Sequence, residues 1–315
     1  MPTLHILGYN LYHFDINTKK IMDEYLTKIK IETSDYTFVA NYLWLSSASG
    51  FYAIINDTFC LFIMQGGQLS MLLPPLGEKE SISKAILECF SVMDENNFEQ
   101  GYSKIEYVHE EFLEFLQKDR YQALKSSDDY LYRCEHLIEL KGNNYHTKRN
   151  EINKFKKMAP IHSIAKIDLG IHKESILKLY GKWVSDRAKN LPKDDDRFLE
   201  GMFYEQRAIQ RLLNSYHKLD VIGIGLFVED ELRGFTFGEK INGSVASVII
   251  EKCDIDLAGS AAFIFREFCR VLRDTYGVEY INVGDDMGFE NLKRAKMSYH
   301  PSALIAKYTI SELVC

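Results

Sequence analysis

Apolar and polar residues alternate with two different periods along this chain, and both periods recur in two places. Short apolar runs separated by acidic or glycine-containing turns predict two antiparallel meanders, and apolar residues at helical spacing predict a helix after each. The first meander has strands at Phe51–Ile55, Phe59–Met64 and Leu69–Leu73, before a helix capped by Ser81 that runs to about Asn97. The second has strands at Val221–Val228, Arg233–Glu239 and Ser244–Ile250, before a helix from Gly259 to Tyr276.

The two meanders align without a gap when residues 51–90 are placed on residues 224–263. Asn56-Asp57 then falls on Glu229-Asp230, so the first hairpin of each copy has an acidic turn. Because the match is one of pattern more than identity, and hairpins followed by helices are common, chance similarity is the alternative reading. We favour a duplicated α/β module.

The other predicted elements do not alternate regularly between strand and helix. Helices are expected at Thr18–Ile29, Glu110–Gln117, Lys173–Leu191, Phe198–Ser215 and Asn291–Lys296, and strands at Lys104–Val108, Tyr130–Cys134, Tyr280–Val283 and Ala303–Thr309. This mixture favours an α+β fold with mixed, mainly antiparallel sheets. The chain has about twice the usual domain length, and the polar stretch Lys125–Asp129 is the best boundary. We expect domains at residues 1–126 and 127–315, with the working site in the second.

Composition narrows the possible partners. The net charge of −7 argues against indiscriminate nucleic-acid binding but allows a local basic patch. Six cysteines without a CxxC pair, and histidines without metal spacing, predict buried thiols and no bound metal. The N-terminus lacks the features of a signal peptide, and no uncharged apolar run approaches the roughly 20 residues of a membrane span. We expect a cytoplasmic protein with no transmembrane segment.

The densest basic segment is Lys141–Lys157, where six Lys or Arg residues accompany one Glu. Its Lys148, Arg149, Asn150 and Asn153 lie within one or two predicted helical turns, where their donors could converge on phosphate oxygens. A solvated amphipathic helix is an equally good reading of this composition.

Two further clusters could carry chemistry. Glu251-Lys252 ends a predicted strand before a helix N-terminus, and α/β proteins tend to bind ligands at such strand ends. The segment NVGDDMGFENLKRAKMSYHP, residues 282–301, could supply a general base, a phosphate clamp and a proton donor, although a salt-bridged loop is the simpler alternative. The candidates in that segment are Asp285, Asp286, Lys293, Arg294, Lys296, Tyr299 and His300.

These same stretches resemble a known family. YHTKRNEINKF (Tyr145–Phe155), IEKCD with GSAAFIFREF (Ile250–Phe268) and the segment 282–301 are similar to the family named for the C-terminal domain of phosphatidylglycerol lysyltransferase. The resemblance covers nearly the whole chain and implies two tandem acetyltransferase-like (GNAT) domains, as in Fem-type peptidoglycan aminoacyltransferases. It also implies transfer of an aminoacyl group from aminoacyl-tRNA to an acceptor such as phosphatidylglycerol.

The sequence departs from its relatives in two ways. The membrane domain that precedes full-length lipid synthases is not present in this sequence, so we expect at most peripheral contact with membrane lipid. The pyrophosphate loop of acetyl-CoA-dependent members is not visible either, because IEKCDIDLAGS contains only Gly259. Aminoacyl-tRNA, bound through the basic patch, is therefore the expected donor, and no cofactor is expected to be permanently bound. An acyl-CoA N-acyltransferase of a small amine and a catalytically silent binding protein remain alternatives.

Within this reading, we assign roles to the candidate residues. Asp285 or Asp286 would act as the base, and Tyr299 or His300 would protonate the leaving ribose oxygen. Arg233, Lys148 and Arg149 would hold phosphate. The remaining substrate-binding candidates are Asn150, Asn153, Glu251, Lys252, Lys293, Arg294 and Lys296.

Overall fold

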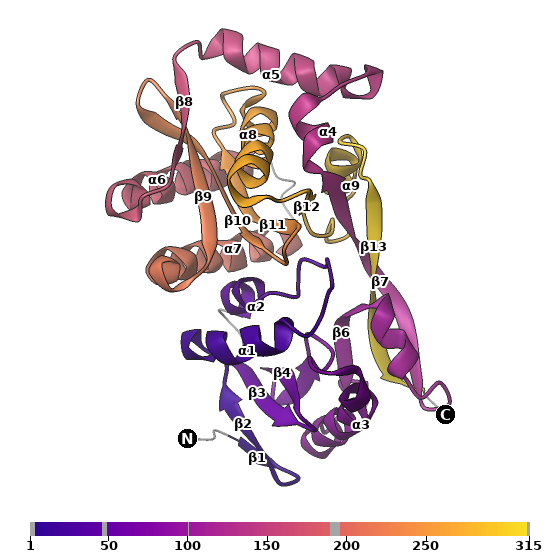
Figure 1. Cartoon of the computed structure of the whole chain (residues 1–315). Helices are drawn as coiled ribbons and strands as arrows, with labels where there is room; N and C mark the ends of the chain where they lie inside the picture. The colour runs from indigo at the N-terminus through magenta and orange to yellow at the C-terminus, as the bar shows by residue number, and fades with distance from the viewer. Residues whose placement is uncertain (1–3, 46–48, 100, 190–195, 314–315) are drawn as a thin grey trace. The chain divides into compact units, whose positions relative to one another are not determined.

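The computed structural model describes residues 4–45, 49–99, 101–189 and 196–313, which form two compact units (Figure 1). The first unit comprises Met1–Asp129, Asp285–Gly288 and Ile305–Cys315, and the second comprises Tyr130–Gly284 and Phe289–Leu304. The chain passes into the second unit between Asp129 and Tyr130, at the end of the predicted boundary stretch, and later returns to the first. Neither unit is therefore a continuous stretch of sequence.

The first unit is built on an antiparallel sheet that ends in one parallel pair. Its strands are β1 (Leu4–Ile6), β2 (Tyr9–His13), β3 (Ser49–Ile55), β4 (Thr58–Gln65), β5 (Gln68–Met71) and β6 (Lys104–His109), and its helices are α1 (Lys19–Leu26), α2 (Phe38–Trp44), α3 (Lys79–Asn96) and the 3₁₀ helices η1 (Ile16–Thr18) and η3 (Glu110–Phe115). β5 is parallel to β6, and β6 is antiparallel to β13 (Ala303–Glu312), near the end of the chain.

Helices cover both faces of the first sheet. Successive residues of a strand point to opposite faces. On β4, the ring of Phe59 lies 6.1 Å from that of Tyr25 in α1, whereas Cys60 Sγ lies 3.4 Å from Cys89 Sγ in α3. α1 and α3 therefore pack on opposite sides of β4, which explains why most of that strand is buried.

The second unit repeats this architecture with longer elements. Its strands are the last four residues of β7 (Tyr121–Arg133), whose earlier residues belong to the first unit, and β8 (His162–Lys166), β9 (Val221–Val228), β10 (Glu231–Lys240), β11 (Val245–Cys253) and β12 (Tyr280–Asn282). Its helices are α4 (Cys134–Glu139), α5 (His146–Met158), α6 (Leu169–Ala188), α7 (Asp196–Ser215), α8 (Ser260–Tyr276), α9 (Glu290–Met297) and the 3₁₀ helices η4 (Asn143–Tyr145) and η5 (Tyr216–Lys218). β11 is parallel to β12, and residues 131–133 of β7 are antiparallel to β12.

The strand orders of the two units correspond, which confirms the predicted duplication. β2-β3-β4-β5-β6 matches β8-β9-β10-β11-β12, with the parallel pair and the preceding helix, α3 or α8, in the same place. Both first hairpins also turn through two residues with positive φ, 48° and 58° at Asn56-Asp57 and 51° and 66° at Glu229-Asp230. Such paired values match the right-handed twist of the strands. The α+β fold with mixed, mainly antiparallel sheets is confirmed as well.

The last strand of each unit comes from an unexpected part of the chain. β7 follows β6 in sequence but pairs with β12 of the second unit, and β13 pairs with β6 of the first. The polar stretch Lys125–Asp129, the predicted boundary, is part of β7. Its first three residues are exposed or partly buried, whereas Asp129 is buried.

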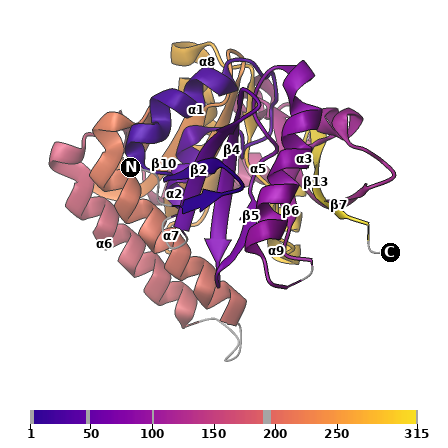
Figure 2. The same ribbon diagram turned by 90° about the horizontal axis from the view of Figure 1, so that it is seen from below.

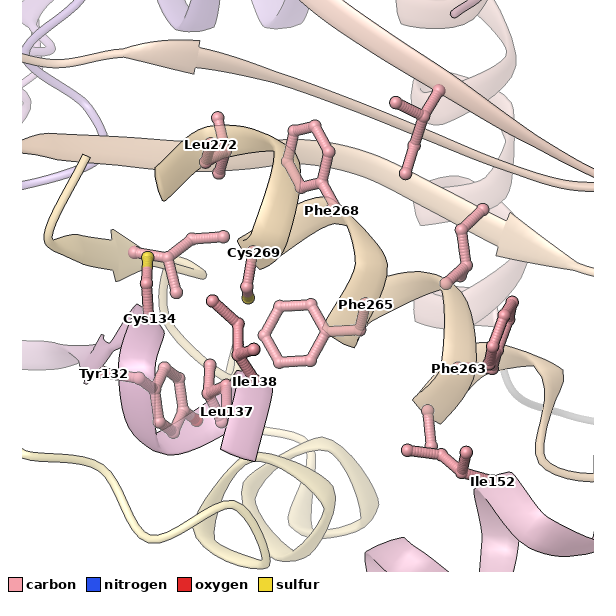
Figure 3. Packing of buried hydrophobic residues seen from close by; sticks show 14 of the residues in the cluster. Tyr132, Cys134, Leu137, Ile138, Ile152, Phe263, Phe265, Phe268, Cys269 and Leu272 are labelled. Atoms are coloured by element: carbon pink, nitrogen blue, oxygen red, sulfur yellow. The ribbon is translucent and has the colours of Figure 1, made fainter. Parts of the chain in front are cut away.

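The main core of the second unit lies around α8. Phe265, Phe268, Cys269 and Leu272 of α8 are buried among side chains of α4 and the sheet (Figure 3). Burying each large apolar side chain contributes roughly 1.5–3 kcal/mol. α4 and α5 both pack on α8, while α6 packs against β10 and β11 and lies beside α7 (Figure 2). The position of α8 on the sheet is therefore strongly determined.

Several local predictions need correction. α3 begins at Lys79 after an N-cap at Glu78, so Ser81 lies inside the helix and does not cap it. The segment predicted as a helix at Glu110–Gln117 is a shorter 3₁₀ helix, and the sequence did not predict β1, β2, α2, α4 or β8. These missed elements are short, so they offer little periodicity to read. The predicted helix end at Leu191 lies outside the described residues.

Candidate functional site

The parallel ladder between β11 and β12 ends before β11 does. The last described pair is Ser247–Asn282, whereas β11 continues to Cys253. Glu251 lies in this continuation, opposite Thr236 of β10. On the same face of β10, side chains added at Gly234 and Gly238 would meet Ile264 and Phe268 of α8. Glu251 and Thr236 therefore face α8.

Glu251 is a partly buried carboxyl whose hydrogen-bond donor is a neutral hydroxyl. Thr236 Oγ1 donates to Glu251 Oε2 at 2.9 Å. Burial raises the pKa of Glu251 to about 7, and this effect outweighs the opposite contributions of the Thr236 hydrogen bond and the Lys252 charge. Glu251 is thus set to exchange a proton near neutral pH.

Tyr299 contributes a phenol near this carboxyl. Burial raises the pKa of Tyr299 well above its usual value, and the nearby charges of Glu251 and Glu151 raise it further, so the hydroxyl keeps its proton. The ring packs 5.2 Å from that of Phe265, and Lys148 Nζ lies 4.2 Å from the ring centre. Lys148 and Tyr299, both predicted site residues, are therefore in contact.

Lys148 is turned inward on α5 and is held by its own helix. Its side chain is 12% exposed, and its Nζ lies 3.2 Å from Glu151 Oε2. A cation placed over an aromatic face is stabilised by the ring quadrupole, more so when it is shielded from water. The side chain that was predicted to hold phosphate is thus engaged by a carboxylate and a ring.

α5 also contacts the start of α8. Gly259, the N-cap of α8, has a φ of +87°, and a Cβ added there would lie 1.9 Å from the carbonyl oxygen of Glu151. Only glycine fits this approach. A helix N-terminus attracts phosphate groups through its exposed N–H groups. Here α5 fills the space beside Gly259. Asp254, which precedes this helix in the sequence, does not cap it.

Asp254 instead belongs to an ion cluster in an open cleft of about 620 Å³. Its carboxylate lies 2.8 Å from Nη2 of Arg233 and also contacts Lys182 of α6. Burial works toward a higher pKa for Asp254, but the Lys182 hydrogen bond, a backbone hydrogen bond and the Arg233 charge outweigh it and lower the pKa. Arg233 is therefore paired with a carboxylate, on the α6 side of the sheet.

Lys252 also points away from Glu251, although the two are adjacent in sequence. Its Nζ lies 2.6 Å from Glu205 Oε1 of α7 and 4.3 Å from the ring centre of Trp183 in α6. Neighbouring residues of a strand face opposite sides, so the predicted pair Glu251-Lys252 is divided between the two faces of the sheet.

Asp285 lies in the first unit, where it contacts the buried Lys307. The two side chains are 2.9 Å apart, and Ser127 Oγ donates to the same carboxylate oxygen at 3.0 Å. Burial works toward a higher pKa for Asp285, but the charge and hydrogen bond of Lys307 outweigh it and lower the pKa. Lys307 also lies 2.8 Å from Asp35 and 2.9 Å from Asp129. These contacts favour a structural role, so general-base catalysis by Asp285 stays a prediction.

The other predicted residues are spread over the surface or bound to the backbone. Arg149 donates to the carbonyl oxygens of Leu140 and Gly142, and Lys296 donates to those of Val283 and Gly284. Asp286 accepts from the backbone N–H of Gly288, His300 lies 3.2 Å from the carbonyl oxygen of Asn144, and Asn150 lies near His146. Asn153, Lys293 and Arg294 are exposed. The anion site expected of these residues is untested.

Sequence reasoning overlooked three residues. Thr236 was hidden in an apolar strand, Glu151 was counted as a lone acid among bases, and Lys307 was not considered. The only sequence signal for Thr236 and Lys307 is a polar side chain within an apolar run, and the only signal for Glu151 is a charge opposite to that of its neighbours. In the described residues, no group of three His, Cys, Asp or Glu side chains could hold a metal ion. No helix of the described part of the chain has the length and apolarity to cross a membrane.

The comparisons with known proteins agree with this architecture. A conserved protein of unknown function from Bacteroides thetaiotaomicron has a similar crystal structure, with a TM-score of 0.84, 24% identity, and coverage of 96% of this chain and 99% of that one. The C-terminal domain of a candidate lysylphosphatidylglycerol synthetase from Agrobacterium fabrum gives a TM-score of 0.66 at 13% identity, covering 93% and 92% of the two chains. These likenesses show that the chain shares its fold with both proteins, including the C-terminal domain of a candidate lysylphosphatidylglycerol synthetase.

The particular family follows from the sequence itself. Residues 27–311 match the family described as "Phosphatidylglycerol lysyltransferase, C-terminal". The chain therefore belongs to that family, which confirms the resemblance drawn from its motifs. An uncharacterized protein of Mycoplasmoides gallisepticum is 25% identical over 192 residues, which are 61% of this chain and 58% of that relative. The chain thus spans less than two thirds of that relative's length.

Proposed function

We propose that this protein is an aminoacyltransferase that takes its aminoacyl group from aminoacyl-tRNA and transfers it to a hydroxyl group of phosphatidylglycerol or a similar acceptor. The observation that carries the proposal is the family match over residues 27–311, which includes both units. The polar residues gathered where β11 continues beyond β12 support a reaction site in the second unit.

The contact between α5 and α8 supports aminoacyl-tRNA over acyl-CoA as the donor. A coenzyme bound by its pyrophosphate needs accessible N–H groups at a helix N-terminus. The close approach of the Glu151 carbonyl oxygen to Gly259 reduces that access and adds a negative partial charge there. An aminoacyl ester makes no such demand on α8.

The test is a transfer assay with labelled aminoacyl-tRNA and vesicles of phosphatidylglycerol. We expect label to move into the lipid fraction, with vesicles of phosphatidylcholine as the negative control. Parallel reactions with acetyl-CoA and small amines test the acyl-CoA alternative. Label transfer from acetyl-CoA alone would contradict the proposed donor, and no transfer from any donor would favour a binding protein.

A further inference from the structure

We propose that Glu251 is the acid–base catalyst of acyl transfer in the second unit and that Thr236 is its positioning residue. This inference rests on the proposed function for the identity of the donor. The geometric basis is the location of Glu251 on the part of β11 that extends past the last pair with β12, where its side chain faces α8 and the residue is partly buried.

Three other carboxylates near the sheet are already paired with cations. Asp254 contacts Arg233 and Lys182, Glu205 contacts Lys252, and Glu151 contacts Lys148. A carboxylate held by a cation is a weaker base, because the ion pair stabilises its charged form. Glu251 instead accepts a hydrogen bond from Thr236, and burial favours its protonated form. It can therefore both accept and return a proton near neutral pH.

The first unit provides an internal comparison for this position. We matched the two units by counting strand pairs from the corresponding hairpin turns, and β10 has one extra residue between Leu232 and Gly234. With that residue skipped, the pair Thr236–Glu251 corresponds to the pair Phe62–Met71. Phe62 and Met71 are both 0% exposed. The same backbone position is thus filled by apolar side chains in one unit and by a hydrogen-bonded carboxyl in the other. Packing does not require a polar pair here, since the first unit is built without one.

The chemical step balances with these groups. The acceptor hydroxyl oxygen attacks the carbonyl carbon of the aminoacyl ester and gives its proton to the Glu251 carboxylate. The bond from the carbonyl carbon to the ribose oxygen then breaks as that oxygen receives the proton from Glu251. The sum is one ester exchanged for another, and no further reactant is needed. Tyr299, which keeps its proton, can donate a hydrogen bond to the charge that develops on the carbonyl oxygen.

The first measurement does not depend on activity. Carboxyl carbons of labelled glutamate are followed by NMR as a function of pH in the full-length protein, and Glu251→Gln identifies the Glu251 signal. We expect Glu251 to titrate near pH 7, about 2.5 units above the ordinary value of 4.5. Titration near the ordinary value would overturn the inference, whatever the donor proves to be.

The second measurement uses transfer activity. We expect Glu251→Gln to lower the turnover number by roughly 10²–10⁴-fold and to remove the rise of activity between about pH 6 and 8, with KM for the donor little changed. The matched control is Glu279→Gln, an exposed position at which full activity is expected. Thr236→Val should shift the same rise to higher pH, because the lost hydrogen bond stabilised the carboxylate. A merely structural threonine would leave the pH profile in place.

The two proposals can fail separately. If the wild-type protein transfers from aminoacyl-tRNA and Glu251→Gln is equally active, the catalytic assignment is wrong and the proposed function stands. If the wild type transfers from acyl-CoA only, the donor is wrong, and the Glu251 variant is tested in that reaction with the same expected loss. If no donor is used, the proposed function and the catalytic role of Glu251 both fail, even if Glu251 titrates near pH 7.

Discussion

In the first unit Phe62 of β4 lies opposite Met71 of β5, and in the second Thr236 of β10 lies opposite Glu251 of β11. The neighbouring parallel strand differs in the same way. Met71 pairs with Ile105 of β6, whereas the β11–β12 ladder ends at Ser247, four residues before Glu251. In the first unit the parallel pairing therefore includes Met71, whereas in the second it stops before Glu251, which carries a polar side chain. The same architecture thus has an apolar structural position in one unit and the proposed reaction site in the other.

Charged side chains follow the same division. In the first unit, Lys307 is buried against Asp35, Asp129 and Asp285, which joins four separate stretches of the chain. In the second, Lys148 and Glu151 lie beside Tyr299 on the side of the sheet that carries Glu251. The charged cluster of the first unit therefore links distant parts of the chain, whereas Lys148 and Glu151 of the second unit lie near the proposed reaction site.

The largest effect is expected from removing the buried cation. Lys307→Met leaves three carboxylates without it, and breaking a buried ion pair costs about 3–5 kcal/mol. We expect a loss of about 5 kcal/mol in the free energy of unfolding, measured with denaturant at pH 7. Lys125→Met is the matched control, with a change below about 1 kcal/mol, because Lys125 is exposed in its pair with Asp128. A stable Lys307→Met protein without transfer activity would instead return Asp285 to the list of catalytic groups.

The second prediction concerns a carboxyl placed in the first unit at the position that corresponds to Glu251. Met71→Glu places a carboxyl at a position with 0% exposure and opposite Phe62, where no donor corresponds to Thr236. We expect a loss of roughly 3–4 kcal/mol at pH 8 that shrinks in acid, because protonation removes the buried charge. Glu251→Met, the reciprocal change, should cost less than about 1 kcal/mol. Equal losses from both would mean that the two positions are not equivalent.

The third prediction concerns the contact of α5 with α8. Gly259→Ala combines positive φ with a clash against the Glu151 carbonyl oxygen, and should cost roughly 2–3 kcal/mol. Gly277→Ala also has positive φ but meets nothing within 4 Å, so about 1 kcal/mol is expected from the backbone alone. Both variants are compared with the wild type by thermal unfolding, and the difference between their losses of unfolding free energy measures the cost of the clash between position 259 and the Glu151 carbonyl oxygen. Equal losses would show that α5 can shift to relieve that clash without measurable cost.

The smallest effect is the pH dependence of stability. Because the folded pKa of Glu251 is raised, the native protein holds its proton more tightly, and stability falls as pH rises from about 4.5 to about 7. Relative to Glu251→Gln, the wild type should lose about 2 kcal/mol over this interval. The contribution of Asp285 to stability changes with pH in the opposite direction. Because its pKa is lowered in the folded protein, Asp285 stabilises the protein at pH values above its pKa in the unfolded chain, and this stabilisation is lost as the pH falls through its pKa in the folded protein. Unfolding curves of Glu251→Gln and Asp285→Asn across pH test both signs.

Much of the fold could be predicted because strand and helix periods are local properties. The acidic turns at Asn56-Asp57 and Glu229-Asp230, together with the apolar runs around them, align the two copies. The exchange of β7 and β13 could not be predicted, since strand pairing between distant segments leaves no local signature. For the site, residue types placed Lys148, Glu251 and Tyr299 among the candidates. Which of them meet depends on strand faces, and the bulge near Arg233 changes those faces by one residue.

The position of β13 has a consequence for synthesis. Residues of β13 between Lys307 and Ser311 pair with β6, which leaves the ribosome about two hundred residues earlier. Until β13 emerges, β6 is an uncovered strand edge, and such edges readily pair with other chains. The first unit therefore cannot complete its sheet while the second is being made. A fragment that stops before β13 should aggregate, even though it contains nearly all of the residues of the second unit.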